Sequence, residues 1–170
     1  MKLLVSGHTG LIGRKIVSAC VKLGIEVIGL SRRPAPDDKP VMNWDKDEVM
    51  AHKIERESPD AVIHLAGESI AGGFWTAKRK GSLYSSRIIR TEKLVRVINL
   101  LSRPPSVFLC ASAIGIYGNQ PTRQCDESCP VGPGFLANIC GDWEEACVSL
   151  DGRVRGLSLR FGMVLSRDGG

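Results

Sequence analysis

Long apolar runs are missing from this sequence of 170 residues. Its apolar stretches fall far short of the roughly 20 residues that a membrane-spanning helix needs. The N-terminus also lacks the features of a signal peptide, because the first strand pattern already begins at Lys2. These absences exclude a membrane protein, and the length allows one domain with a real core. We expect a cytoplasmic protein with no membrane partner.

Aromatic residues are also scarce, at 5% of the chain. The net charge of +5 is modest, and much of it lies between residues 78 and 103. A nucleic-acid interface would need a series of aromatic residues among these charges as a base-stacking surface, which the segment lacks. We therefore interpret it as a solvated helix face and expect no nucleic-acid partner. A basic nucleic-acid interface is the alternative.

Metal ligands are few, with three histidines and six cysteines. Cys125 and Cys129 form a C-x3-C pair in a loop, but a zinc site would need two further ligands. Cys20 and Cys110 fall in a helical and an apolar strand pattern, which favours buried thiols. The sequence therefore predicts no metal site, and free thiols in a reducing compartment.

Apolar strands alternate with helical patterns along the chain. The predicted strands are 2–6, 26–31, 40–44, 60–67, 106–112 and 154–162. The predicted helices are 10–23, one that Asp45 caps and that runs to about 57, 76–101 and 135–150. This alternation implies parallel pairing with right-handed crossovers. It predicts an α/β fold of the Rossmann type, a doubly wound parallel sheet with helices on both faces.

A glycine turn, "SGHTGLIG", lies between the first strand and the first helix. Gly7 permits a tight exit from the strand, Gly10 lets the backbone approach a pyrophosphate, and Gly13 lets the helix pack on the sheet. Free N–H groups and the helix dipole there favour an anion. The turn predicts dinucleotide binding, with a purely structural turn as the alternative. The predicted contacts are Gly7, His8, Thr9, Gly10, Leu11, Ile12 and Gly13; the His8 side chain could equally point to solvent.

The second strand ends in Ser31, Arg32 and Arg33, where an NAD-binding protein usually carries Asp or Glu. Guanidinium groups are planar, multidentate and always charged, which suits a 2′-phosphate. The sequence therefore favours NADP over NAD. Solvated loop arginines are the alternative.

The motifs together resemble a known family. "HLAGESIAGGFWTAKRK", "PPSVFLCASAIGIYG", "CGDWEEA" and "LRFGMVLSRDGG" are similar to epimerase-like members of the extended short-chain dehydrogenase/reductase superfamily. These are often described as nucleoside-diphosphate-sugar epimerases, and some as cell-division inhibitors. The resemblance implies that Leu65, Ala66 and Gly67 pass beside the adenine-side ribose and the pyrophosphate. It also implies that Arg32 meets the adenosine phosphate and that Ser112 lies near the nicotinamide.

The superfamily's usual catalytic pair, Tyr-x-x-x-Lys, is absent, because neither Tyr84 nor Tyr117 has Lys four residues later. The resemblance places the two slots at Phe135 and Ile139, which can neither move a proton nor carry charge. The standard mechanism is therefore in doubt. Chemistry at this site would need other groups.

Four residues are candidates for that chemistry. Ser112 is the last residue of the predicted fifth strand. Tyr117 could reach the nicotinamide, or pack as a loop aromatic. Glu68 could act as a base, or serve only as a cap or loop carboxylate. Arg87 could bind an acidic substrate, or lie on a helix surface.

Four other polar or aromatic residues receive structural interpretations. We interpret His64 and Trp143 as core residues. We interpret Glu144 and Glu145 as solvated carboxylates on the last helix.

The family resemblance also predicts a smaller C-terminal portion that closes over the substrate. This chain stops at "VLSRDGG", so we interpret residues 1–170 as the Rossmann domain of a truncated protein or fragment. We expect an exposed edge at the sixth strand, with reduced stability or self-association into a homo-oligomer.

The sequence thus favours an enzyme, an NADP-binding epimerase or dehydratase-like oxidoreductase. Its small-molecule substrate would be sugar-nucleotide-like or a carbonyl compound. A catalytically inactive nucleotide-binding regulatory or interaction module is the alternative.

Overall fold

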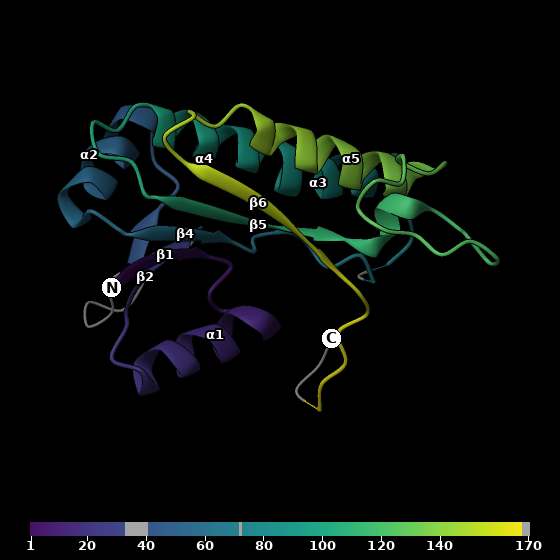
Figure 1. Cartoon of the computed structure of the whole chain (residues 1–170), viewed down its shortest axis with the longest axis horizontal. Helices are drawn as coiled ribbons and strands as arrows, with labels where there is room; N and C mark the ends of the chain where they lie inside the picture. Colours follow the sequence, from purple (N-terminus) through teal and green to yellow (C-terminus); the bar gives the residue numbers. More distant parts are fainter. Residues whose placement is uncertain (33–40, 72, 168–170) are drawn as a thin grey trace.

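Six parallel strands form one sheet in the computed structural model, which describes residues 1–32, 41–71 and 73–167 (Figure 1). The strand order is β3-β2-β1-β4-β5-β6, so the order reverses beside β1. This is the Rossmann arrangement, and it confirms the predicted fold class. The strands are β1 (Lys2–Ser6), β2 (Glu26–Ser31), β3 (Val41–Asn43), β4 (Ala61–His64), β5 (Val107–Ala113) and β6 (Arg155–Phe161).

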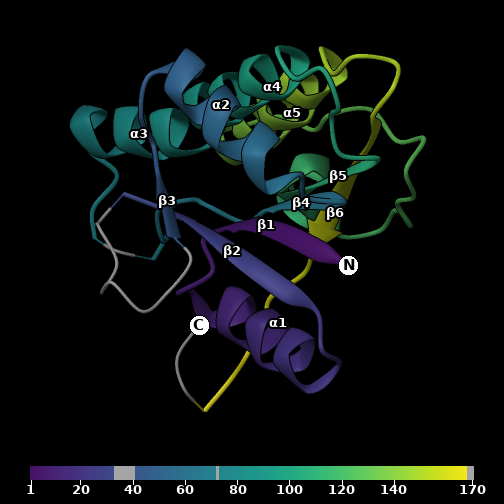
Figure 2. The ribbon, with the colours of Figure 1, turned by 90° about the vertical axis from the view of Figure 1, so that its left-hand side faces the viewer.

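Helices cover the two faces of the sheet unequally. In both ribbon views α1 lies alone on one face, whereas the four other labelled helices lie on the opposite face (Figures 1 and 2). The helices are α1 (Leu11–Lys22), α2 (Asp47–Glu57), α3 (Ala77–Tyr84), the π-helix η1 (Ser85–Ile89), α4 (Arg90–Asn99), the 3-10 turn η2 (Ile114–Tyr117) and α5 (Phe135–Val148).

Two predicted features of the helices need correction. Asp45 does not cap α2, because the helix begins at Asp47 with Lys46 at the N-cap; the Asp45 carboxylate instead accepts a 2.6 Å hydrogen bond from Lys53 Nζ. The helix predicted over 76–101 is not uniform, since the π-helix η1 separates α3 from α4. Position 40 of the predicted third strand lies outside the described residues.

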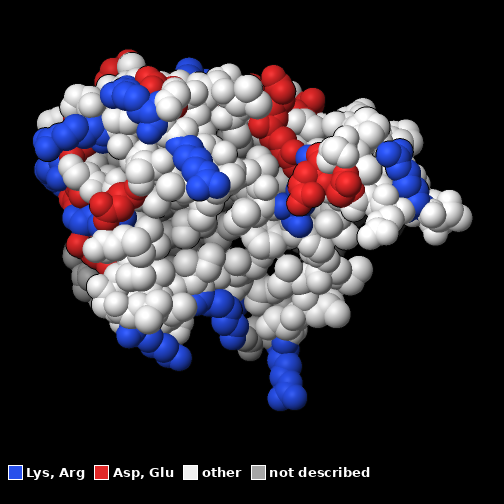
Figure 3. All heavy atoms as spheres, in the orientation of Figure 1, with Lys and Arg blue, Asp and Glu red and all other residues white. Residues whose placement is uncertain are grey.

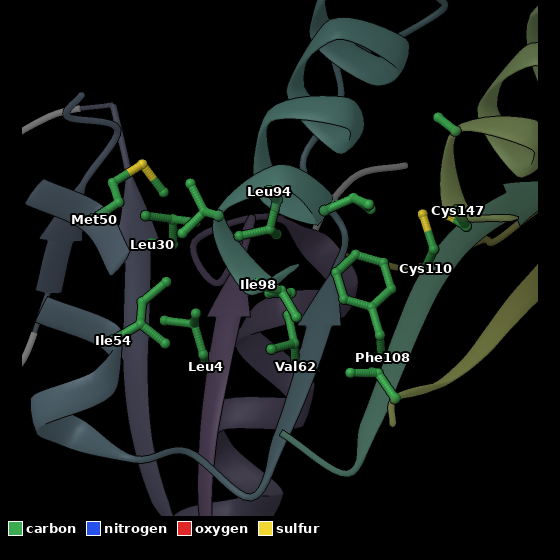
Figure 4. Close-up of a cluster of buried hydrophobic side chains, with 14 of the residues drawn as sticks. Leu4, Leu30, Met50, Ile54, Val62, Leu94, Ile98, Phe108, Cys110 and Cys147 are labelled. Atoms are coloured by element: carbon green, nitrogen blue, oxygen red, sulfur yellow. The ribbon is translucent and has the colours of Figure 1, made fainter. Parts of the chain in front are cut away.

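The main hydrophobic core lies between the sheet and the helices α2, α4 and α5 (Figure 4). Leu4, Val62 and Phe108 from three adjacent strands are fully buried there. Leu94 and Ile98, four residues apart on α4, lie on one helix face and are also fully buried. This packing fixes α4, and therefore the residues at its N-terminus, against the carboxyl ends of the strands.

The face of the sheet that carries α1 is sparsely covered at β5 and β6 (Figure 1). β6 is the edge strand, and Leu157 and Leu159 are 36% and 38% exposed on it. The expected exposed edge is therefore present.

Within residues 1–32, 41–71 and 73–167, no helix is long and apolar enough to cross a membrane.

The basic segment of the sequence is interspersed with acidic groups. Lys93 and Arg96 both pair with Asp47, at 3.2 Å, and Figure 3 shows mixed charges on the face of the molecule that it draws. This mixture favours the interpretation as a solvated face, and the absence of a nucleic-acid partner stays a prediction.

Candidate functional site

Two glycines allow the turn after β1 to fold against its neighbours. Gly7 has φ +70°, and a Cβ there would lie 2.8 Å from the Leu65 carbonyl carbon. A Cβ on Gly13 would lie 2.2 Å from the Gly7 oxygen. Gly10 is the N-cap of α1, and its N–H donates to Gly7 O at 2.9 Å. The turn therefore brings the N-terminus of α1, with its unpaired N–H groups, to the point where the strand order reverses.

A cavity of about 380 Å³ opens at this point, and we call it the switch-point cavity. Its lining residues are Gly7, His8, Thr9, Gly10, Leu30, Ser31, Arg32, Trp44, Leu65, Ala66, Gly67, Glu68, Ser86 and Arg90. The structure thus brings together most of the predicted cofactor contacts. Leu11 and Ile12, half-buried, and Gly13, buried, lie in the first turn of α1 and are not among the lining residues. Ser112 lines a different cavity. Arg33 lies outside the described residues.

The His8 side chain turns inward. A Cβ added to Gly29 of β2 would lie 2.5 Å from the His8 ring, so the ring lies against the β2 backbone. The alternative of a solvent-pointing ring is therefore wrong. Gly29 provides the space for it, a pairing that the sequence alone does not show.

A buried hydrogen-bond network holds the loop after β4. Thr91 Oγ1 donates to Arg87 O at 2.7 Å and accepts from Trp143 Nε1 at 2.9 Å. His64 Nε2, 3.0 Å from the same Oγ1, must therefore be its donor, which leaves Nδ1 to accept from Ser6 Oγ at 2.5 Å. Burial, with a contribution from the Arg90 charge, lowers the pKa of His64 to about 3. His64 is a neutral core histidine, as predicted.

The other end of this network reaches the switch-point cavity. Ser6 Oγ accepts hydrogen bonds from the N–H groups of Leu65 and Ala66, at 3.2 and 3.3 Å. The backbone of Glu68 is held by Ser86 Oγ and by Arg87 Nη2, at 3.1 and 2.8 Å. The loop that borders the cavity is therefore fixed at both ends.

Glu68 makes an ion pair within this loop. Its Oε2 accepts from Arg79 Nη1 at 2.7 Å, and Arg79 also donates to Ser69 O. This arrangement favours the interpretation of Glu68 as a loop carboxylate that positions residues 65–69. Its role as a base stays a prediction.

Arg87 is buried, at 8% exposed, so its interpretation as a surface arginine is wrong. Its guanidinium lies over the Trp143 ring at 5.2 Å, and burial lowers its pKa from the usual value. It lines a second cavity of about 170 Å³, which we call the Ser112 cavity. Cys140 and Ile139 of α5 line this cavity with Ser112. Arg87 and Ser112 therefore both belong to the wall of this cavity, and the Arg87 guanidinium donates to Glu68 O at 2.8 Å.

The Ser112 hydroxyl belongs to an ionic cluster that the sequence did not reveal. Ser112 Oγ donates to Glu144 Oε1 at 2.5 Å. Arg160 Nε and Nη2 donate to the two Glu144 oxygens at 2.9 and 2.8 Å, and Arg160 Nη1 donates to Tyr117 Oη at 2.9 Å. The interpretation of Glu144 as a solvated carboxylate is therefore wrong.

The cluster stays ionised over a wide pH range. Burial opposes the Glu144 charge, but the hydrogen bonds from Arg160 and Ser112 outweigh it and hold the pKa of Glu144 below its usual range. The same carboxylate raises the pKa of Arg160. Tyr117 lies under the Arg160 guanidinium, 5.2 Å from it.

The helix α5 carries no replacement for the missing tyrosine and lysine at its expected slots. Phe135 is half-buried and packs edge-on against Trp75 at 5.7 Å, and Ile139 is buried in the wall of the Ser112 cavity. All six cysteines are free thiols. Within the part of the chain that the structure describes, no group of three His, Cys, Asp or Glu side chains could hold a metal ion.

The strand order, the glycine turn and the cavity beside it define an NAD(P)-binding protein of the Rossmann class. The chain belongs to the NAD dependent epimerase/dehydratase family, whose pattern matches residues 3–162. This confirms the family resemblance of the sequence.

The relatives show how much of the family protein this chain spans. The chain is 34% identical over 167 residues to epimerase family protein Mb2239 of Mycobacterium bovis, covering 98% of this chain and 54% of that protein. It is 33% identical over 178 residues to the chloroplastic SDR39U1 homolog of Arabidopsis thaliana, covering 100% and 51%. The crystal structure of human epimerase family protein SDR39U1 with NADPH superposes with a TM-score of 0.88 at 32% identity, covering 100% and 56%. The chain spans about half the length of the curated relatives it matches.

Proposed function

We propose that this chain is the cofactor-binding portion of an NADP-dependent epimerase or oxidoreductase. Its small-molecule substrate would be sugar-nucleotide-like or a carbonyl compound. The observation that carries the proposal is the glycine turn, which directs the N-terminus of α1 into the switch-point cavity. That arrangement suits a dinucleotide pyrophosphate. The remaining half of the relatives' length would supply most of the substrate contacts.

The preference for NADP rests on the end of β2. Arg32 lines the switch-point cavity where an NAD-binding protein usually presents a carboxylate. Arg33 follows it in the sequence. The similar human protein SDR39U1 was crystallised with NADPH, which supports the same choice here.

The proton would move through Ser112 and Glu144. NADP, when bound, supplies hydride exchange with a substrate carbon. A substrate hydroxyl in the Ser112 cavity would pass its proton to Ser112 Oγ while the Ser112 proton passes to Glu144 Oε1, 2.5 Å away. Arg160 keeps Glu144 in the ionised form, although the lowered pKa also makes the carboxylate a weaker base. In the reverse direction the same groups return the proton to a carbonyl oxygen.

Arg87 and Tyr117 are the other candidates for contacts with the substrate. The buried Arg87 lines the Ser112 cavity, and its charge would attract an acidic or electron-rich substrate group. Tyr117 Oη accepts from Arg160, so its own proton is available to a ligand. A cavity of about 170 Å³ accommodates one reacting ring rather than a whole sugar nucleotide. We propose a cytoplasmic site of action, although the Arabidopsis relative is named as chloroplastic.

Calorimetric titration of the chain with NADPH and then NADH tests this function. We expect both to bind, NADPH more tightly. Equal affinities would contradict the NADP preference. No binding by a chain shown to be folded would contradict the proposed function.

A second function follows from the α5 slots. Phe135 and Ile139 replace the usual proton-transfer pair, which favours a catalytically inactive nucleotide-binding module. Stable binding of NADPH without oxidation across a panel of carbonyl substrates, measured on a full-length relative, would support it. Turnover of any panel member would contradict it.

A further inference from the structure

We infer that Arg90, at the start of α4, is a second specificity-determining residue for the 2′-phosphate, opposite Arg32. The inference rests on the proposed function, because it names the group that holds one end of the same cofactor. The sequence motifs did not single out Arg90 for this role. Its assignment comes from where the π-helix places it.

Arg90 and Arg32 face a common space. Both line the switch-point cavity, and both line an adjoining open groove of about 370 Å³. Lys78, Glu68 and three serines, Ser82, Ser85 and Ser86, also line the groove. The Ser86 hydroxyl already donates to Leu83 O at 3.1 Å, and Glu68 pairs with Arg79, so the three cations Arg32, Lys78 and Arg90 are the groups that suit a phosphate dianion.

The Arg90 guanidinium is held against an aromatic ring. It lies 4.9 Å from the centre of the half-buried Trp44 ring, and Trp44 packs edge-on against the buried His64 at 6.1 Å. Stacking on an aromatic face restricts the motion of a guanidinium group. Its N–H donors lie in the plane of the guanidinium and can still bind a ligand. Binding of an anion at Arg90 would therefore require little ordering.

The two guanidinium groups repel each other. Burial and the charge of Arg32 both lower the pKa of Arg90 from its usual value. Within the described ranges, no carboxylate forms an ion pair with either arginine, and Glu68 in the same cavity pairs with Arg79. A dianion between the two would relieve this repulsion, whereas the ribose hydroxyl of NAD would not.

The π-helix explains why Arg90 faces the cavity. One π turn takes an extra residue and rotates the following residues by about 100° relative to an uninterrupted α-helix. Ser86 in η1 and Arg90 directly after it line the switch-point cavity, whereas Arg87 in η1 lines the Ser112 cavity. The π-helix thus places residues at both cavities, and therefore at both ends of the proposed cofactor.

The test uses two fragments of the cofactor that contain only its adenine end, so contacts of the nicotinamide end do not contribute to the measured affinity. Binding of 2′,5′-ADP and of 5′-ADP is measured by calorimetry for the wild-type chain and for R90Q, R32Q and R96Q. Arg96 lies on the same helix and is half-exposed, so R96Q matches the loss of charge. Circular dichroism and thermal unfolding verify that each variant is folded.

We expect the wild-type chain to prefer 2′,5′-ADP. R90Q and R32Q should each weaken 2′,5′-ADP binding by about 10- to 100-fold, leaving 5′-ADP binding within about threefold, and R96Q should change neither. An R90Q chain that keeps the wild-type preference, or that weakens both ligands equally, overturns the inference. If NADPH and NADH still bind the wild-type chain in that case, the proposed function stands. If a folded wild-type chain binds no dinucleotide, both fail.

Discussion

The buried His64 makes a sharp prediction about acid stability. Its pKa is about 3 in the folded chain, because burial and the nearby Arg90 charge oppose protonation, and about 6.5 in an unfolded chain. Between these values the unfolded chain binds more protons, so the free energy of unfolding falls as the pH falls. The loss begins near pH 6.5, and from pH 7 to pH 5 it amounts to about 2 kcal/mol.

The assay is urea unfolding followed by tryptophan fluorescence between pH 7 and pH 5. Trp143 belongs to the same network as His64, so its emission reports on this region. The window lies above pH 5 because Glu144 and other carboxylates with lowered pKa values lose their contribution at lower pH. His64→Gln removes the titrating group, and the exposed His52 provides the control His52→Gln.

The wild-type chain and His52→Gln should share the steep pH dependence. His64→Gln should start about 2 kcal/mol less stable at pH 7, since Ser6 or Thr91 loses a buried partner, but its pH dependence should be shallow. If His64→Gln is as steep as the wild-type chain over this window, the assignment of a neutral, buried His64 is refuted.

Three further predictions concern the turn, the ionic cluster and the sheet edge. Gly13→Ala should destabilise the chain by at least about 2 kcal/mol and abolish NADPH binding, because its Cβ would lie 2.2 Å from Gly7 O; Gly81→Ala, with open space around its Cβ, should be neutral or stabilising in the same thermal melts. Glu144→Gln should lower the free energy of unfolding at pH 7 by about 2–4 kcal/mol, because it leaves the Arg160 cation unpaired. That difference should shrink as the pH falls below the usual Glu value of about 4.3, and a difference independent of pH would count against the ion pair. Leu159→Lys, on the sparsely covered sheet face, should reduce self-association in analytical ultracentrifugation, whereas a monomeric wild-type chain would contradict the exposed-edge argument.

Local patterns were enough to predict the fold and the glycine turn. The spacing of Gly7, Gly10 and Gly13 between a strand and a helix involves neighbours in sequence, and the strand–helix alternation follows from hydrophobic periodicity. The start of α2 was predicted wrongly because Asp is a common N-cap residue, and Asp45 lies just before the helix. Its carboxylate instead pairs with Lys53 across the first turns of α2, a choice that capping preference does not reveal.

The side chains that the sequence misassigned depend on distant contacts. Glu144 has the surface spacing of a solvated carboxylate, yet α5 lies over β6, where Arg160 pairs with it. Arg87 lies in a basic segment, but the π-helix turns it into the core. No local propensity reports a π turn, so Arg87 and Arg90 could not be assigned to their cavities before the structure was known.

One hydrogen-bond network links the two cavities. From His64 it runs through Ser6 to the backbone of residues 65 and 66, beside the switch-point cavity. In the other direction it runs through Thr91 to the Arg87 carbonyl and to Trp143, which stacks with the Arg87 guanidinium at the Ser112 cavity. The hydroxyls of Ser6 and Thr91 in this network each donate one hydrogen bond and accept the others. Only the neutral Nε2–H tautomer of His64 therefore satisfies every member of the network. A histidine that burial keeps neutral therefore holds the π-helix and the loop after β4 in one fixed relation, and with them the two ends of the proposed cofactor site.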